Sequence, residues 1–299
     1  MSWMLAALLA PAIYSAVNFI DKYILEGTEL DYWSLLIFTS IVSLGFSLFM
    51  WEKAGMPALP NQAMLFFFLS GALSVWGSVL YFKAISRTAA STIIVMLQLT
   101  PVMVLVISYF FLNEQLSVIQ FAGFFVIIAS AIGLIGAIRD KEESSVSFIA
   151  VLLICGADLM WAVSSVLFKM AAPAASVTGA IAYQNFGFAL GGLMFLLFPQ
   201  IGRRVLTIYR DTRRAALMLL FLDTGLFMMG KVCSAFAISR GPVSLVSAVG
   251  STQAVFAILF GWIFGTVAPA IFKENIARRR LYVELAMALA MVLGLWLIA

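Results

Sequence analysis

The chain has 299 residues, of which 64% are hydrophobic and 11% are charged, and its mean hydropathy is +1.08. A typical soluble domain carries about 25% charged residues, so this composition excludes a soluble protein and predicts an integral membrane protein. Histidine is absent, which excludes catalysis, metal binding and pH sensing that depend on an imidazole. The formal net charge is +4, and the positions of the basic residues along the chain are more informative than this sum.

The predicted elements are ten apolar runs, each close to the length of about 20 residues that a helix needs to cross the hydrocarbon core. They cover residues 2–24, 33–51, 62–83, 89–111, 118–138, 148–169, 178–198, 215–238, 242–265 and 281–298. The runs are continuously apolar, which disfavours a β-barrel and predicts an all-α fold. The first run lacks the basic segment and cleavage site of a removable signal peptide, so we expect it to remain as a span. The polar connections, including residues 200–214, are too short to fold alone.

Two parts of the chain resemble each other. Residues 83–91 read KAISRTAAS and residues 236–244 read FAISRGPVS, so AISR recurs at an offset of 153 residues, between the third and fourth spans of each half. Three pairs in the first span of each half match at an offset of 147, namely Tyr14 with Trp161, Asn18 with Ser165 and Lys22 with Lys169. We therefore predict two five-helix repeats, residues 1–145 and 146–299. Because five is odd, the two copies must be inverted relative to each other, as in many secondary transporters.

Basic residues are concentrated on one side of the predicted membrane topology. The connections after spans one, three, five, seven and nine hold 14 Lys and Arg residues, whereas the opposite side holds 3, which are Lys53, Lys169 and Arg240. Cytoplasmic loops carry the excess of basic residues. Both termini are therefore predicted to lie outside the cytoplasm.

Several short motifs surround the two AISR copies. They are AISRTAAS at 84–91, LTP at 99–101, LNEQL at 112–116, QFAG at 120–123, AISRGPVS at 237–244 and ENI at 274–276. With the ten spans, they resemble the drug/metabolite transporter superfamily, specifically its ten-helix EamA-type members. The resemblance covers the whole chain and implies transport of a small solute, without naming a substrate. Two features depart from the family pattern, because the termini are predicted outside the cytoplasm and Ala254 stands where Pro101 would map.

Three ionisable residues lie well inside apolar spans: Asp158, Asp223 and Lys231. A charge at the centre of a membrane helix is costly, so such a residue usually faces a cavity or a partner. Asp223 and Lys231 are eight residues apart, which is about 12 Å along one helix, so a partner on another helix is needed, and Asp158 is one candidate for Lys231. A carboxylate suits proton coupling, and a lysine suits an anionic or zwitterionic substrate. A structural ion-pair network is the alternative.

Further polar and aromatic side chains are candidates for the substrate site. Tyr14 and Asn18 share one face of the first span, and Asp158, Trp161 and Ser165 share one face of the sixth. In the family that the chain resembles, both spans line the central space. Packing between helices would explain the aromatic residues equally well. The remaining candidates lie near mid-span, where hydrogen bonds between helices are the alternative: Gln98, Tyr183, Asn185 and Gln253.

The leading hypothesis is a secondary transporter of the bacterial inner membrane. It would move a small organic metabolite or drug, amino-acid-like, zwitterionic or anionic, by alternating access, as an exporter or exchanger. A flippase for a lipid or lipid-linked head group is the alternative. An enzyme is disfavoured, because the GxGD motif of intramembrane aspartyl proteases is missing after Gly156 and no GxSxG or zinc motif is present. The expected partners are the substrate, the bilayer and protons, with no cofactor, metal or nucleic acid.

The oligomeric state is predicted as a monomer or weak dimer. Two GxxxG pairs, Gly187 with Gly191 and Gly261 with Gly265, allow helices to approach closely. They fit packing inside the chain as well as packing between two copies.

Overall fold

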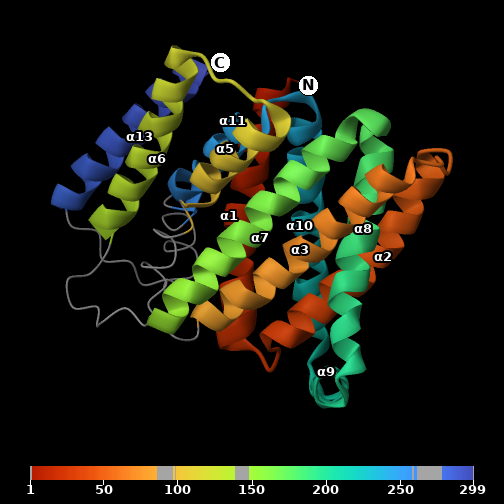
Figure 1. The fold of residues 1–299 in the computed structure, drawn as a ribbon. Helices are drawn as coiled ribbons and strands as arrows, with labels where there is room; N and C mark the ends of the chain where they lie inside the picture. The colour runs from red at the N-terminus through yellow and green to blue at the C-terminus, as the bar shows by residue number, and fades with distance from the viewer. Residues whose placement is uncertain are drawn as a thin grey trace.

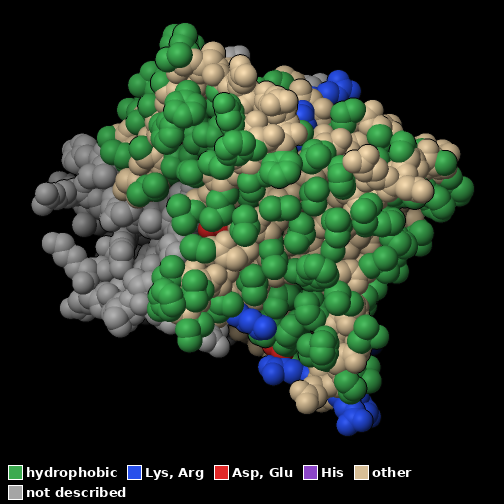
Figure 2. All heavy atoms as spheres, viewed as in Figure 1, with side chains coloured by type: hydrophobic (Ala, Val, Ile, Leu, Met, Phe, Trp, Pro, Cys, Tyr) green, Lys and Arg blue, Asp and Glu red, His purple; other side chains and the backbone are tan. Residues whose placement is uncertain are grey.

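The computed structural model describes residues 2–85, 97, 99–138, 148–257, 259–260 and 278–298. Within these ranges every regular element is a helix, which confirms the all-α prediction for the described residues. Both termini lie at the same end of the molecule (Figure 1). Hydrophobic side chains cover most of the face shown in Figure 2, as expected for a surface in contact with lipid.

Six helices are long and apolar enough to cross a membrane. They are α1 (Trp3–Gly27), α2 (Tyr32–Lys53), α3 (Asn61–Ile85), α7 (Phe148–Ala171), α8 (Val177–Leu193) and α10 (Arg214–Arg240). The 3-10 turns η1 (Ala172–Ala174) and η2 (Met194–Leu197) extend α7 and α8. Each of the six lies on a predicted span.

Four further apolar helices lie on the other predicted spans. They are α5 (Leu99–Leu112), α6 (Val118–Ile138), α11 (Val243–Gly250) and α13 (Arg278–Ile298). α6 and α13 form an antiparallel pair beside the main bundle (Figure 1), with Gly123 packed against Gly294. The AISR stretch of the first half lies largely outside the described residues.

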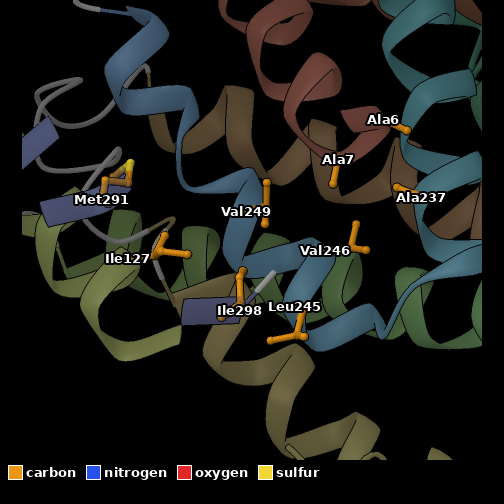
Figure 3. Packing of buried hydrophobic residues seen from close by; sticks show 10 residues of the cluster. Ala6, Ala7, Ile127, Ala237, Leu245, Val246, Val249, Met291 and Ile298 are labelled. Atoms are coloured by element: carbon orange, nitrogen blue, oxygen red, sulfur yellow. The ribbon is translucent and has the colours of Figure 1, made fainter. Parts of the chain in front are cut away.

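A buried apolar cluster joins the α6–α13 pair to the rest of the molecule (Figure 3). Ala6 and Ala7 on α1, Ile127 on α6 and Ala237 on α10 contribute to it. α11 and α13 complete it with Leu245, Val246, Val249, Met291 and Ile298. The cluster therefore packs helices from both halves of the sequence around the short helix α11.

The predicted connection 200–214 contains a further helix, α9 (Pro199–Asp211). It lies at the end of the molecule opposite both termini (Figure 1), and basic side chains gather at that end in Figure 2. Pro199 starts the helix at a position where its fixed φ is favourable and its missing N–H costs nothing. Val205 is its buried residue. The basic residues favoured a polar connection in the prediction. In the structure they occupy the polar surface of an amphipathic helix.

Contacts with the start of α2 fix the position of α9. Asp31 caps α2, accepting hydrogen bonds from the Ser34 backbone N at 2.9 Å and from Ser34 Oγ at 2.8 Å. The same carboxylate pairs with Arg204 Nε of α9 at 2.6 Å. Tyr209 Oη donates to the Ser34 carbonyl at 2.5 Å, and burial, followed by the charge of Asp31, raises the pKa of Tyr209 above its ordinary value.

Asp31→Ala is expected to lower the free energy of unfolding by about 1–2 kcal/mol. The substitution removes a helix cap, which is worth about 1 kcal/mol, together with an ion pair whose arginine is largely exposed and adds little. Thermal unfolding in detergent measures the change. Asp211→Ala, at the exposed end of α9, is the matched control and should be close to neutral. Equal stability of the two variants would contradict the capping role.

Candidate functional site

Three charged side chains are buried inside the apolar spans, as predicted. Asp158 on α7 is fully buried, and the exposed fractions of Asp223 and Lys231 on α10 are 4% and 7%. Charged residues persist in membrane helices where they contact a partner or line a cavity. The structure places these three in different surroundings.

Asp158 faces helix α5. The two helices run parallel, because Val104 and Ala162 share one buried cluster a turn beyond the contact between Thr100 and Asp158. Thr100 Oγ1 donates to Asp158 Oδ1 at 2.6 Å, and Asp158 Oδ2 is buried without a hydrogen-bond partner among the described residues. A carboxylate accepts about four hydrogen bonds, so Asp158 keeps capacity for a proton or a ligand donor.

Lys231 is held by neutral groups. Its Nζ donates to Asn185 Oδ1 on α8 at 2.8 Å and lies 4.0 Å from the centroid of the Phe188 ring and 5.9 Å from that of Phe227. Asn185 Nδ2 donates to the Ile181 carbonyl at 2.9 Å, which fixes the amide oxygen toward the lysine. Asp158, one candidate partner of Lys231, accepts from Thr100 instead, and Lys231 donates to Asn185. A cation on aromatic faces is stabilised by about 2 kcal/mol or more when desolvated, and its charge stays available to an anion.

Asp223 lies on the interface between α10 and α1. These helices are antiparallel, because Trp3 packs against Gly241, Tyr14 against Gly230, and Ile24 in one cluster with Leu220. This register puts Asp21 of α1 at the level of Asp223, and the two carboxyl groups interact electrostatically. Asp223 Oδ1 is buried and has no hydrogen-bond partner in the described structure.

Sequence reasoning missed Asp21, because it was taken as the end of the first span. Tyr14, Asn18 and Asp21 are spaced i, i+4 and i+7, so they share one helix face. That spacing was the available signal. Thr100 and the hydroxyl groups of Ser70, Ser74 and Ser164 were also missed, since single Ser and Thr residues are common in membrane helices.

The two predicted aromatic residues pack against glycines on neighbouring helices. The Tyr14 ring lies against Gly230 and 5.8 Å from the Phe227 ring. The Trp161 ring lies against Gly77 of α3, where Trp161 Nε1 donates to the Ser74 carbonyl at 3.0 Å. Both rings therefore fill contacts between helices.

The other predicted residues are spread over the molecule. Asn18 is exposed, and Ser165 Oγ donates to the Trp161 carbonyl of its own helix at 3.0 Å. Tyr183 Oη donates to the Pro57 carbonyl at 2.7 Å, which anchors the α2–α3 connection. Gln253 is partly buried just after α11, and Gln98 lies outside the described residues.

A serine cluster joins α3, α7 and α8. Ser164 Oγ lies 2.8 Å from Ser74 Oγ and 3.1 Å from Ser70 Oγ, and Gln184 Nε2 donates to Ser70 Oγ at 3.0 Å. Such contacts are worth about 0.6–2 kcal/mol each in membranes. They hold the three helices at a fixed spacing on one side of Trp161.

Comparison with known proteins adds two likenesses. A sequence profile described as the EamA-like transporter family matches residues 1–136 and 148–274. A solved structure described only as "Crystal structure of protein" aligns over 99% of this chain and 96% of that chain, with a TM-score of 0.72 and 17% sequence identity. At this identity the likeness concerns the fold alone. A search of curated proteins gives no match.

Proposed function

The chain belongs to the EamA-like transporter family, and we propose that it is a secondary transporter of a small anionic or zwitterionic organic solute. The observation that carries this proposal is Lys231, a buried cation inside a membrane span that neutral and aromatic groups hold. A structural lysine would be neutralised by a carboxylate, because an unpaired charge in a low-dielectric interior is costly. Among the residues that the structure describes, no carboxylate pairs with Lys231, and we assign this role to an anionic group of the solute.

The proposed site centres on the contact between α8 and α10 around Lys231. Lys231 supplies the positive charge, and Phe188 and Phe227 supply apolar walls. Tyr14 connects these walls to α1 through its contact with Phe227. The carboxyl groups lie outside this contact, since Asp223 and Asp21 are about two helical turns from Lys231 and Asp158 faces Thr100. We assign to them the ammonium group of an amino-acid-like solute or a coupling proton.

We further propose that the chain consists of two inverted five-helix repeats, with ten spans in all, that work by alternating access. Matching contacts support this proposal. Tyr14 against Gly230 and Trp161 against Gly77 are the same contact in the two halves, because the offsets of 147 and 153 residues relate their members. The family profile also matches each half separately. The excess of basic residues at the α9 end supports a multi-pass protein of the bacterial inner membrane with both termini outside the cytoplasm.

Transport by purified protein in liposomes tests the proposal. Liposomes are loaded with a mixture of unlabelled amino acids and carboxylic acids, and the exchange of each labelled compound is followed. Lys231→Met is expected to lower exchange of the anionic or zwitterionic compounds by about tenfold or more, because a charge-assisted hydrogen bond is worth about 1.5–3 kcal/mol. Lys53→Met, at the exposed end of α2, should leave exchange unchanged.

Two results would overturn the proposal. Movement of a fluorescent phospholipid between leaflets without exchange of any solute would favour the flippase. Undiminished exchange of anions by Lys231→Met would remove the lysine from the substrate site.

A further inference from the structure

The interface between α1 and α10 contains a carboxyl pair that sequence reasoning did not assign. Contacts at three levels fix the antiparallel register of these helices: Trp3 with Gly241, Tyr14 with Gly230, and Ile24 with Leu220. Asp21 and Asp223 fall at one level in this register, between the second and third contacts. Asp223 lies nine residues from the start of α10, which is about 14 Å along the helix. Asp21 lies six residues before the end of α1, about 9 Å along that helix. The pair therefore lies inside a hydrocarbon core about 30 Å thick, nearer the side where α1 ends and α10 begins.

Within the described part of the chain, Asp223 has no partner that would neutralise it. Its side chain is 4% exposed, and its Oδ1 is buried without a hydrogen bond among the described residues. Its electrostatic neighbour on α1 is another carboxyl group, that of Asp21. Two negative charges this close in a medium of low dielectric repel strongly, so a site of this kind binds one proton in place of a second charge.

The contacts at this level of the interface, among the residues that the structure describes, are mostly with uncharged side chains. On α3, Tyr81 interacts electrostatically with Asp21, and on α2, Thr39 lies 3.4 Å from Thr224, the residue after Asp223. Tyr14 on α1 and Lys231 on α10 lie more than one helical turn away from the carboxyl pair, toward the N-terminus of α1 and the C-terminus of α10. On α7, Asp158 is bonded to Thr100, and the Lys169 ammonium is bonded to the carbonyls of Ile238 and Gly241 at the far end of α10.

We propose that Asp21 and Asp223 form the proton-binding site that couples this transporter to a pH gradient. A proton from water binds a carboxylate oxygen of the pair while α1 and α10 are packed together. It returns to water on the other side of the membrane when the two helices separate at this level. The inference rests on the proposed transport function, and it adds Asp21 and the identity of the coupling ion.

The position of the pair explains why it can couple. α1 belongs to the first half of the sequence and α10 to the second, so the pair lies across the interface that alternating access must open. Without the proton, repulsion between the carboxylates favours separation of the helices, and with it the packed state is favoured. A proton suits the pair better than a metal cation, because the described residues contain no group of three or more acidic, thiol or imidazole ligands.

Infrared difference spectroscopy of the full-length protein in liposomes tests the pair without a transported solute. The C=O stretch of a protonated carboxyl group is followed during a pH titration. The wild type is expected to show a titrating band that disappears in both Asp21→Asn and Asp223→Asn, although each variant keeps one carboxyl group. Asp211→Asn, the same change at an exposed position, should keep the band. Asp223→Glu, which restores a carboxyl group, should keep a shifted band.

A transport assay with the same variants tests the coupling role of the pair separately from transport itself. With a pH gradient, wild-type liposomes should accumulate one of the amino or carboxylic acids, and both Asn variants should exchange it without accumulation. A band that survives in both Asn variants, or that disappears only in Asp158→Asn, would overturn the pair while leaving transport standing. A band that responds to sodium at constant pH would assign the site to a metal cation instead. A wild-type band that behaves as expected, with no solute moved, would leave the pair standing and overturn the transport function.

Discussion

Gly71→Ala is expected to destabilise the protein by about 3 kcal/mol or more, because overpacking against backbone leaves no flexible side chain to yield. A Cβ on Gly71 of α3 would overlap with backbone atoms of Gln184 and Phe188 on α8 and lie 2.8 Å from the carbonyl carbon of Gly187. The two helices would have to separate along their contact. The serine cluster and the packing around Phe188 would separate with them.

Gly45→Ala is the matched control. Gly45 lies in α2, is exposed, and has no atom within 4 Å of its Cβ position. There the substitution should stabilise the helix by up to about 1 kcal/mol, since alanine has the higher helix propensity. Thermal unfolding in detergent should therefore move in opposite directions for the two variants. A small effect of Gly71→Ala would contradict the direct backbone contact between α3 and α8.

The contact between α3 and α8 shows whether the glycines Gly187 and Gly191 pack within the chain or between two copies. Gly187 packs against Phe68 and Gly191 against Ala72, both on α3. This GxxxG pair therefore serves packing inside the chain. The pattern indicated a close approach but not the partner helix, and Gly71, which has no glycine four residues away, gave no signal. The other pair, Gly261 and Gly265, lies outside the described residues.

The helices could be predicted because a membrane helix needs a long apolar run, and that requirement is local in sequence. The buried charges Asp158, Asp223 and Lys231 could be predicted for the same reason. Their partners could not, because Thr100, Asn185 and Asp21 meet them only through helix pairing. Asp158 was one candidate partner for Lys231, and the two residues contact other groups in the structure. Opposite charge suggested the pair, whereas the packing of α8 on α10 offered Asn185.

The LNEQL motif has a specific structural role that its sequence did not reveal. Glu114 follows α5 and caps the N-terminus of α11, which is far from it in the sequence. Its Oε1 accepts from Val243 N at 2.8 Å, and its Oε2 accepts from Ser244 N at 3.2 Å and from Ser244 Oγ at 2.9 Å. α11 has no local side-chain cap, because Pro242 occupies that position. A carboxylate there also interacts favourably with the helix dipole.

Lys169 completes this arrangement from α7. Its Nζ donates to the carbonyls of Ile238 at 2.9 Å and Gly241 at 2.6 Å, which are the free acceptors at the end of α10. The cation at one helix end and the anion at the start of the next hold the turn of the second AISRGPVS copy between them. The repeated motif therefore supplies a junction that Glu114 of the first half and Lys169 of the second half clamp.

Glu114→Ala is expected to lower the free energy of unfolding by about 3 kcal/mol, because it leaves the Val243 and Ser244 donors without their acceptor and removes the anion next to Lys169. Glu114→Gln should cost about half as much, since an amide oxygen can still accept from Val243 N while its NH₂ group cannot accept from Ser244. Glu52→Ala, at the exposed end of α2, should be close to neutral.

A double-mutant cycle with Lys169→Met tests whether the two charges act together. Because both hold one turn, the loss in the double variant should be smaller than the sum of the single losses by about 1 kcal/mol. Strict additivity would mean that Glu114 and Lys169 stabilise α11 and α10 independently. Unfolding of each variant in detergent gives all four free energies under one condition. The clamp stands only if the Glu114 variants rank with alanine below glutamine and the cycle shows coupling.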